Sequence, residues 1–303
     1  MTYSLVARDA DGQTFGVATA SKYLAVGASV TAVAAGVGAL ATQASTNVSF
    51  RERGLRSLRA GLTAGRTVDL LVEGDPDRPR RQLAVLAATG RPATWTGSAC
   101  GPVAGEAVGD DCVAVGNLLA GDGVLPAMVE AFEAAGGTLA DRLLAGLVAG
   151  ERAGGDRRGR QSAALLVAAG QGTLHLRSAD RVDLRVDDHH DPLGELARAL
   201  RKHHVLVAEP DAAGAAPLTG ATARAVDTDL RALGRTVGPV ADRLAAWAAD
   251  ENLEHLLLDG AVDALLRAEL ARDAGAHRIG ASAGRSPRGR ANLPGRRVQD
   301  RAR

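Results

Sequence analysis

The residue with the most self-contained chemistry is Thr2, which directly follows the initiator methionine. A threonine is small enough for methionine removal, which would leave a hydroxyl and a free α-amino group on one residue. The α-amine has an ordinary pKa of about 7.7 to 8.0, so it is partly neutral near pH 7 and can accept the hydroxyl proton. This start is compatible with a nucleophilic threonine, although Met-Thr also begins many proteins without such a role.

Other chemical motifs are weaker. A P-loop needs Gly-Lys followed by Ser or Thr, and neither lysine of the chain, Lys22 or Lys202, follows a glycine. The run 36–41 fits a dinucleotide-binding fingerprint on paper, but β-prone residues follow where a helix should begin. The Asp- and His-rich run 187–191 is interpreted as a cap for a helix that begins at Pro192, rather than as a metal site. We therefore predict no cofactor and no metal.

Composition limits the classes of partner. Hydrophobic residues make up 46% of the 303 residues and aromatic residues only 2%, so a core of Ala, Val and Leu is expected and aromatic platforms for nucleic acid are not. The formal net charge of +1 gives no global field for polyanions. No apolar run reaches the roughly 20 residues of a membrane span, and no signal peptide is recognisable. We expect a cytoplasmic protein that binds neither nucleic acid nor membrane.

The pattern of apolar residues predicts strands and helices in an unusual order. Four strands come first, at 4–8, 15–19, 29–34 and 37–43, and two short helices follow within 49–75. Strands at 82–87, 93–96 and 112–116 precede two helices within 122–155, and strands at 162–167, 173–176 and 182–186 precede a helix near Pro192. This order predicts an α+β protein with two antiparallel sheets packed face to face and helices on the outer faces.

The last third of the chain reads as a separate module. Residues 206–222 have the Pro, Gly and Ala content of a linker, and helices are predicted at 223–233, 239–250 and 260–272. We predict a main domain over 1–205, a linker over 206–222, a small helical domain over 223–275 and a disordered basic tail over 276–303.

Several runs of the sequence resemble a known family. The runs TYSLVARD, GVATASKYLAVGA, AGVGALATQASTN, GSAC, VGNLLAG, AGGDRRGRQSAALLV and RVDLRVDDHHDP are similar, in order, to the domain of unknown function 1028 family. The resemblance covers about residues 2 to 205. It implies the αββα sandwich of the N-terminal-nucleophile (Ntn) hydrolases, such as proteasome β-subunits. The stretch ENLEHLLLDGAVDALLRAEL resembles a domain described as peptidoglycan-binding that some members carry.

The resemblance assigns roles to residues near the expected strand ends. Thr2 stands where this fold has its nucleophile and α-amino base. Ser21 and Lys22 end the second strand, where proteasome-like enzymes keep an acidic and a basic group, although the acid is absent here. Amide donors for an oxyanion are sought at Gln43, Asn47 and Asn117.

The polar run 154–162 is open to two interpretations. It is either a tight charged turn that enters a strand, or a loop in which Asp156 or Arg160 orients a substrate carboxylate or amine.

Two functions follow as expectations. The first is an amide hydrolase that acts through Thr2 on a small N-acyl or peptide-like substrate. The second is a non-catalytic protein of the same fold that binds a metabolite or a protein partner. A homo-oligomer is left open.

Overall fold

The structure, a computed structural model, describes residues 2–170 and 181–283. The chain divides into two compact units, Met1–Val207 and Ala208–Arg303. Strands and helices both contribute, and the strands of the larger unit pair antiparallel. The predicted α+β class with antiparallel sheets is confirmed.

The larger of the two main sheets places the first strand of the chain near its centre. Its order is β10-β9-β2-β1-β8-β7. The strands are β1 (Thr2–Arg8), β2 (Phe15–Ser21), β7 (Gly105–Val108), β8 (Cys112–Asn117), β9 (Ser162–Ala168) and β10 (Arg181–Val186). Strand β1 therefore pairs on one side with β2 and on the other with β8, so the backbone groups on both its edges are hydrogen-bonded.

The second sheet has the order β3-β4-β5-β6. Its strands are β3 (Thr31–Ala34), β4 (Gly38–Ala44), β5 (Arg81–Ala87) and β6 (Ala93–Thr96), and a short helix α1 (Gly27–Val30) leads into β3. Strand β4 pairs with β5 in a register that places Gln43 opposite Gln82. Helices α2 (Ser49–Arg59) and α3 (Ala64–Val72) and the 3-10 turn Arg78–Arg80 connect these two strands.

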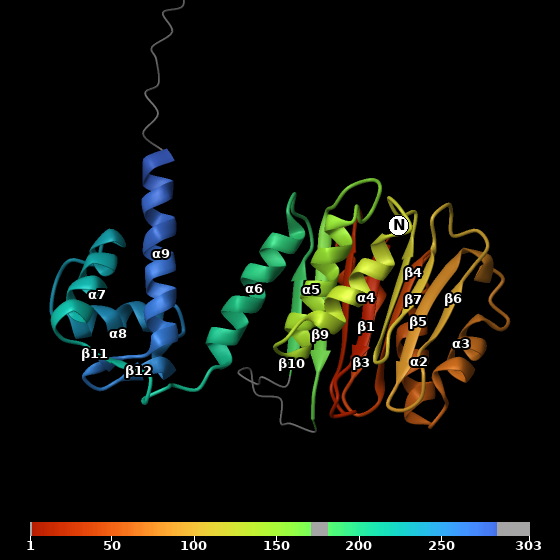
Figure 1. The fold of residues 1–303 in the computed structure, drawn as a ribbon, viewed down its shortest axis with the longest axis horizontal. Coiled ribbons are helices and arrows are strands. Elements are labelled where there is room, and N and C mark those ends of the chain that lie inside the picture. The colour runs from red at the N-terminus through yellow and green to blue at the C-terminus, as the bar shows by residue number, and fades with distance from the viewer. Residues whose placement is uncertain (1, 171–180, 284–303) are drawn as a thin grey trace, which may run out of the picture. The chain divides into compact units, whose positions relative to one another are not determined.

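Alternation along the strands explains how the layers pack. One buried cluster joins Val6, Phe15 and Val17 of the first sheet to Ala39 and Leu86 of the second. The intervening residues of β1, such as Leu5, pack instead with helices α4 (Val124–Ala134), α5 (Leu139–Arg152) and α6 (Pro192–Val207). A further cluster packs α2 and α3 on the outer face of β4 and β5. The two groups of helices lie on opposite sides of the paired sheets (Figure 1).

Local sequence signals account for the helix ends. Thr138 and Asp141 form a reciprocal capping box at the start of α5, and the Thr63 hydroxyl accepts from the Arg66 N–H at the start of α3. Such caps satisfy N–H groups that have no partner within the helix. They mark the starts of two helices that cover the outer faces.

The structure differs from the sequence-based expectations at several places. The strand expected at 29–34 begins as helix α1, and the short strand β7 was not predicted, because its four residues alternate between partial burial and exposure without an apolar run. The strand expected at 173–176 lies outside the described residues. The other strand predictions of the larger unit are confirmed to within two residues at each end.

The described part of the smaller unit, residues 208–283, contains three α-helices, one 3-10 turn and a small sheet. Helices α7 (Gly220–Ala232), α8 (Val240–Asp250) and α9 (Ala264–Ala283) accompany the strands β11 (Ala216–Pro217), β12 (Leu257–Leu258) and β13 (Ala261–Val262), none of which was predicted. Helix α9 continues well beyond the expected end at Arg272. Arg278 in its second half donates to the largely buried Asp229 of α7, which ties this part of the helix to the unit.

A close backbone approach at Gly38 yields a stability prediction. Gly38 has φ +152° in β4, and a Cβ there would meet the Leu86 carbonyl oxygen at 2.3 Å. Gly61 also has a positive φ, +85°, but has no atom within 4 Å of its Cβ position. We expect Gly38→Ala to lower the free energy of unfolding by about 3 kcal/mol and Gly61→Ala by about 1 kcal/mol, because only the first adds a backbone clash to the strain. Urea unfolding followed by circular dichroism measures both. Equal losses would show that the close approach at Gly38 is unimportant.

Candidate functional site

Polar residues gather at one end of the space between the two sheets. Asn117, Thr2 and Ser21 are neighbours on β8, β1 and β2, because Thr2 pairs with Asn117 and the β1–β2 register continues to Ser21. Thr2 is 6% exposed, and Ser21 and Asn117 are 1% exposed. The next residues along the same face of β1 and β2 are Ser4 and Thr19, and Val6 and Val17 follow beyond them. The space between the sheets is therefore filled by apolar side chains at one end and by a buried polar cluster at the other.

Two glutamines of the opposite sheet meet this cluster. The Gln43 carboxamide accepts from Ser4 Oγ at 2.6 Å and donates to the Thr2 carbonyl at 3.1 Å and to Gln82 Oε1 at 2.8 Å. The Asn117 amide donates to the same Gln82 oxygen at 2.9 Å, and its nitrogen lies 3.5 Å from the Thr2 carbonyl oxygen. Three carboxamides therefore converge behind the first residue of β1.

Gln82 connects the sheets most directly. Its Nε2 donates to the Gly116 carbonyl at 2.7 Å and to Thr96 Oγ1 at 3.0 Å, while its oxygen accepts from Gln43 and Asn117. A buried carboxamide costs free energy unless its donors and acceptor are all used, and here they are. Sequence reasoning missed Gln82. A glutamine just before the apolar run LAVLA, at an inward position of a buried strand, was the available signal.

The Thr2 side chain points to its neighbour on β2. Its hydroxyl donates to Ser21 Oγ at 3.2 Å, so Ser21 is a predicted site residue in direct side-chain contact with Thr2. The structure brings Thr2, Ser21, Gln43 and Asn117 together. Gln43 and Asn117, however, already donate their amide protons within the protein, so they hold the Thr2 backbone instead of presenting free donors.

Strained backbone surrounds the same end of the sheets. Among the described residues of the larger unit, the non-glycine residues with positive φ are Ala25, Ala44, Val103 and Leu118. Ala44 directly follows Gln43 and Leu118 directly follows Asn117, while the other two lie in loops at this end. Such conformations cost about 1 to 3 kcal/mol each and gather at functional sites. For Val103 the cost is highest, since its side chain is β-branched.

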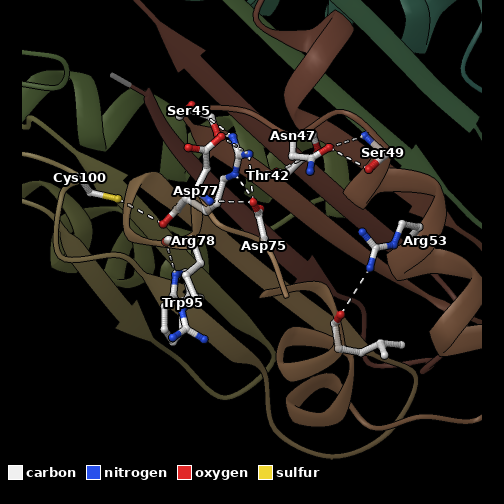
Figure 2. A network of polar contacts seen from close by, with 12 residues as sticks. Thr42, Ser45, Asn47, Ser49, Arg53, Asp75, Asp77, Arg78, Trp95 and Cys100 are labelled. Atoms are coloured by element: carbon white, nitrogen blue, oxygen red, sulfur yellow. Dashed lines mark hydrogen bonds and ion pairs between the residues drawn. The ribbon is translucent and has the colours of Figure 1, made fainter. Parts of the chain in front are cut away.

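A buried ion pair fixes the ends of β4 and β5, which carry Gln43 and Gln82. Arg81 is 8% exposed, and its Nε donates to Asp75 Oδ2 at 2.9 Å while its Nη1 donates to the Ser45 carbonyl at 2.6 Å. The hydrogen bonds from Arg81 hold the pKa of the Asp75 carboxyl below its usual value, with smaller contributions from the Asp77 N–H and the Asn47 amide. Asp75, Asp77 and Ser45 converge in one network (Figure 2).

Asn47 belongs to that network and not to the cluster around Thr2. Its Oδ1 accepts from the Ser49 N–H at 3.1 Å and from Ser49 Oγ at 2.8 Å (Figure 2). Its side chain also contributes to the lowered pKa of the Asp75 carboxyl. Asn47 therefore forms an Asx turn just before α2. Its oxygen is used within the protein, and its expected substrate-binding role stays a prediction.

The run 154–162 is the α5–β9 connection, and its acidic residue is buried. Asp156 is 4% exposed and accepts from the Lys22 N–H at 2.8 Å and from the Arg158 N–H at 2.9 Å. Arg160 lies near Glu151 and Asp191, with nitrogen–oxygen distances of 3.7 and 3.5 Å. The Lys22 ammonium is directed to the Arg160 carbonyl, 3.4 Å away, instead of to Thr2. Asp156 thus holds the loop, and Arg160 is held by carboxylates.

Neither cysteine has the chemistry of a nucleophile. Burial raises the pKa of the Cys100 thiol, and burial together with the charge of Glu133 raises the pKa of Cys112 to about 12. Cys100 Sγ lies 3.2 Å from the Arg81 carbonyl oxygen, to which it donates (Figure 2). Both thiols are therefore protonated near pH 7.

A comparison with known families decides where the chain belongs. A family model described as "Family of unknown function (DUF1028)" matches residues 2–196. The chain belongs to the DUF1028 family. The match spans every strand of the two main sheets and ends within α6. The family resemblance expected from the sequence runs is confirmed.

A solved structure of the family is similar to this DUF1028 chain. It is the crystal structure of protein SPO2555 from Silicibacter pomeroyi, itself described as DUF1028, with 31% sequence identity and a TM-score of 0.61. The match covers 80% of this chain and 93% of that one. A search of curated proteins found no match.

Two further findings concern the described residues of the DUF1028 chain. Within residues 2–170 and 181–283, no group of three or more His, Cys, Asp or Glu side chains is placed to hold a metal ion. No helix in the same described ranges is both long enough and apolar enough to span a membrane.

The bonding of Gln82 predicts a large effect of its replacement. We expect Gln82→Leu in this DUF1028 protein to lower the free energy of unfolding by about 3 kcal/mol, since it leaves the amides of Gln43 and Asn117 without their shared acceptor. Gln161→Leu is the control, because that side chain is at the surface and donates only to Asp188, at 3.1 Å; a loss below about 0.5 kcal/mol is expected there. Chemical unfolding of both variants provides the comparison. Similar losses of stability in the two variants would show that the hydrogen bonds of Gln82 do not stabilise the contact between the sheets.

The Asp75 carboxylate gives a prediction with a defined pH window. Its folded-state pKa is lowered, so its stabilising effect is complete above the unfolded pKa of about 3.9 and is lost as pH falls through the folded value. Asp75→Asn should cost about 3 kcal/mol at pH 7, and the gap to wild type should persist down to pH 5 and narrow below about pH 4. Asp77→Asn, at a carboxylate whose side chain is 56% exposed beside the same Arg81, should cost under about 1 kcal/mol. A gap that stays constant to pH 3 would contradict this assignment.

Proposed function

We propose that the larger unit is an αββα sandwich of the Ntn-hydrolase type and that Thr2 is the nucleophile of an amide hydrolase. The observation that carries the proposal is the setting of Thr2. It is the first residue of a central strand, at the polar end of the space between the sheets, with its hydroxyl bonded to Ser21 and its carbonyl held by Gln43.

The polar end of the space between the sheets carries costs in stability, which supports a functional role for it. Buried carboxamides and hydroxyls at inward strand positions contribute less to stability than well-packed apolar residues would, and strained residues follow directly after Gln43 and Asn117. A fold selected for stability alone would extend the valine-rich core to the end of the strands. The free-energy cost of the buried polar side chains and that of the strained backbone both occur around Thr2.

The reaction uses the two groups of one residue. After removal of Met1, the neutral α-amine of Thr2 takes the hydroxyl proton, directly or through a water, as Oγ1 adds to the carbonyl carbon of the amide. Collapse of the tetrahedral intermediate breaks the carbon–nitrogen bond, and the ammonium returns the proton to the leaving amine. Water then hydrolyses the resulting ester by the same steps and restores the hydroxyl. The substrate class is a small N-acyl or peptide-like amide.

The alternative is a non-catalytic protein of the same fold that binds a metabolite or protein partner. One observation favours it. Gln43 and Asn117 donate their amide protons to Gln82 and, for Gln43, to the Thr2 carbonyl, so an oxyanion would need other donors. The C-terminal unit, whose sequence resembles a peptidoglycan-binding domain, is proposed as a docking or dimerisation element.

Mutation of Thr2 separates the two functions. A panel of small N-acyl and peptide-like amides is screened against protein whose intact mass shows that Met1 has been removed. We expect Thr2→Ala to abolish turnover of any amide that the wild type hydrolyses, and Thr2→Ser to retain part of it, because serine keeps both the hydroxyl and the amine. Turnover should rise with pH as the amine loses its proton, and the midpoint of the rise should lie near or below about pH 8.

The control is Thr14→Ala, just before the start of β2 and so at the opposite end of that strand from Ser21, where the hydroxyl donates to Asp11 at 2.6 Å. Thr14→Ala should leave turnover unchanged, and all of the variants should keep the wild-type circular dichroism spectrum. Wild-type turnover in Thr2→Ala would exclude this mechanism. A chain that retains Met1, or that hydrolyses none of the amides, would favour the non-catalytic alternative.

A further inference from the structure

The loop 154–161 is bound on one side to the end of β2. The Gln161 N–H donates to the Ser21 carbonyl at 3.0 Å. The buried Asp156 carboxylate accepts from the Lys22 N–H at 2.8 Å. The loop is therefore fixed to the two residues at which β2 ends.

On its other side the loop is bound to the residues that follow β8. The Ala120 N–H donates to the Gly155 carbonyl at 3.0 Å, and the Arg157 N–H donates to the Leu118 carbonyl at 3.4 Å. Strand β1 lies between β2 and β8 in the sheet. A loop bound to both neighbours must cross the end of β1 at which Thr2 lies.

Some of the basic side chains near the loop 154–161 are paired with carboxylates, and others are not. Arg158 pairs with Asp156 at 3.1 Å, and Arg160 lies between two carboxylates. Arg157 is exposed and Lys22 is exposed, and neither forms an ion pair with any residue in the described part of the chain. The Lys22 ammonium is directed to the Arg160 carbonyl, so it lies against the loop.

Acidic residues also approach this end of the sheet. The Asp188 carboxylate accepts from the Gln161 side chain at 3.1 Å, and the Asp187 carbonyl accepts from the Ala25 N–H at 2.9 Å. Neither carboxylate forms an ion pair with Lys22 or Arg157 within residues 2–170 and 181–283. Both cations therefore keep an unneutralised charge beside the end of β1.

We propose that Lys22 and Arg157 bind a carboxylate of the substrate, so that the amide cleaved by Thr2 belongs to an anionic molecule such as an N-acyl amino acid. This inference rests on the function proposed for Thr2. Arginine presents a planar fork that matches a carboxylate, and lysine adds a mobile point charge. Their position next to the end of β1 places the carboxylate a short distance from the reacting amide.

The test measures binding without turnover, in the full chain carrying Thr2→Ala. The probes are N-acetylglycine, N-acetylleucine and N-acetylphenylalanine, each paired with its neutral carboxamide, and affinity is measured by isothermal titration calorimetry. We expect at least one acid to bind about tenfold more tightly than its carboxamide. Adding Arg157→Gln or Lys22→Gln should weaken binding of that acid by about tenfold each and leave the carboxamide unchanged. Arg59→Gln, an exposed arginine at the end of α2, is the matched control and should change neither.

The outcomes separate this inference from the proposed reaction. Equal affinity for each acid and its carboxamide, no binding of any acid, or an acid affinity that survives both substitutions would overturn the carboxylate site. Because turnover is not measured, a charge-selective site that depends on Arg157 would stand even if Thr2→Ala later proved fully active. That second result would remove the mechanism and leave the site as a binding site for carboxylates.

Discussion

The carboxamide of Gln82 is the interaction on which the polar end of the larger unit depends. It receives protons from one residue in each sheet and returns protons to the backbone of β8 and to β6, so the two sheets share one set of hydrogen bonds. Hydrogen bonds in a dry interior are strong, and an unsatisfied group there is costly. The spacing of the sheets at this end is thus set by the length of glutamine side chains instead of by the packing of valines.

This arrangement also explains why the neighbouring backbone is strained. Gln43 is the last residue but one of β4, Asn117 ends β8, and both amides point inward. The chain turns away directly after them through Ala44 and Leu118, which have positive φ. The Arg81–Asp75 pair secures the two strand ends of the second sheet against that strain. Rigidity at this end is therefore provided by polar contacts, whereas the opposite end is held by close-packed apolar side chains.

Much of the fold could be predicted from sequence, because alternating apolar runs separated by turn residues define strands whichever sheet they join. The site was less accessible. Thr2 was singled out from its chain position and Ser21 from the family resemblance, and the structure places the two side chains in contact. Gln82 was missed because a single glutamine before a buried strand has no local signature of its bonding partners. Asn47 was proposed as an amide donor on its residue type, and residue type alone does not show which way the chain turns after β4. The turn after β4 carries it into the network of Asp75 instead.

The central position of β1 has a consequence for the timing of events during synthesis. The strand is closed on one side by β2, which follows within a few residues, but on the other by β8, whose last residue, Asn117, is made 115 residues after Thr2. At about 5 to 20 residues per second, the ribosome needs roughly 6 to 23 s to supply that partner. An aminopeptidase needs an accessible, extended N-terminus, and in the folded unit Thr2 is 6% exposed. The removal of Met1 that the proposed reaction requires is therefore in kinetic competition with closure of the sheet, and the late synthesis of β8 lengthens the time available for it.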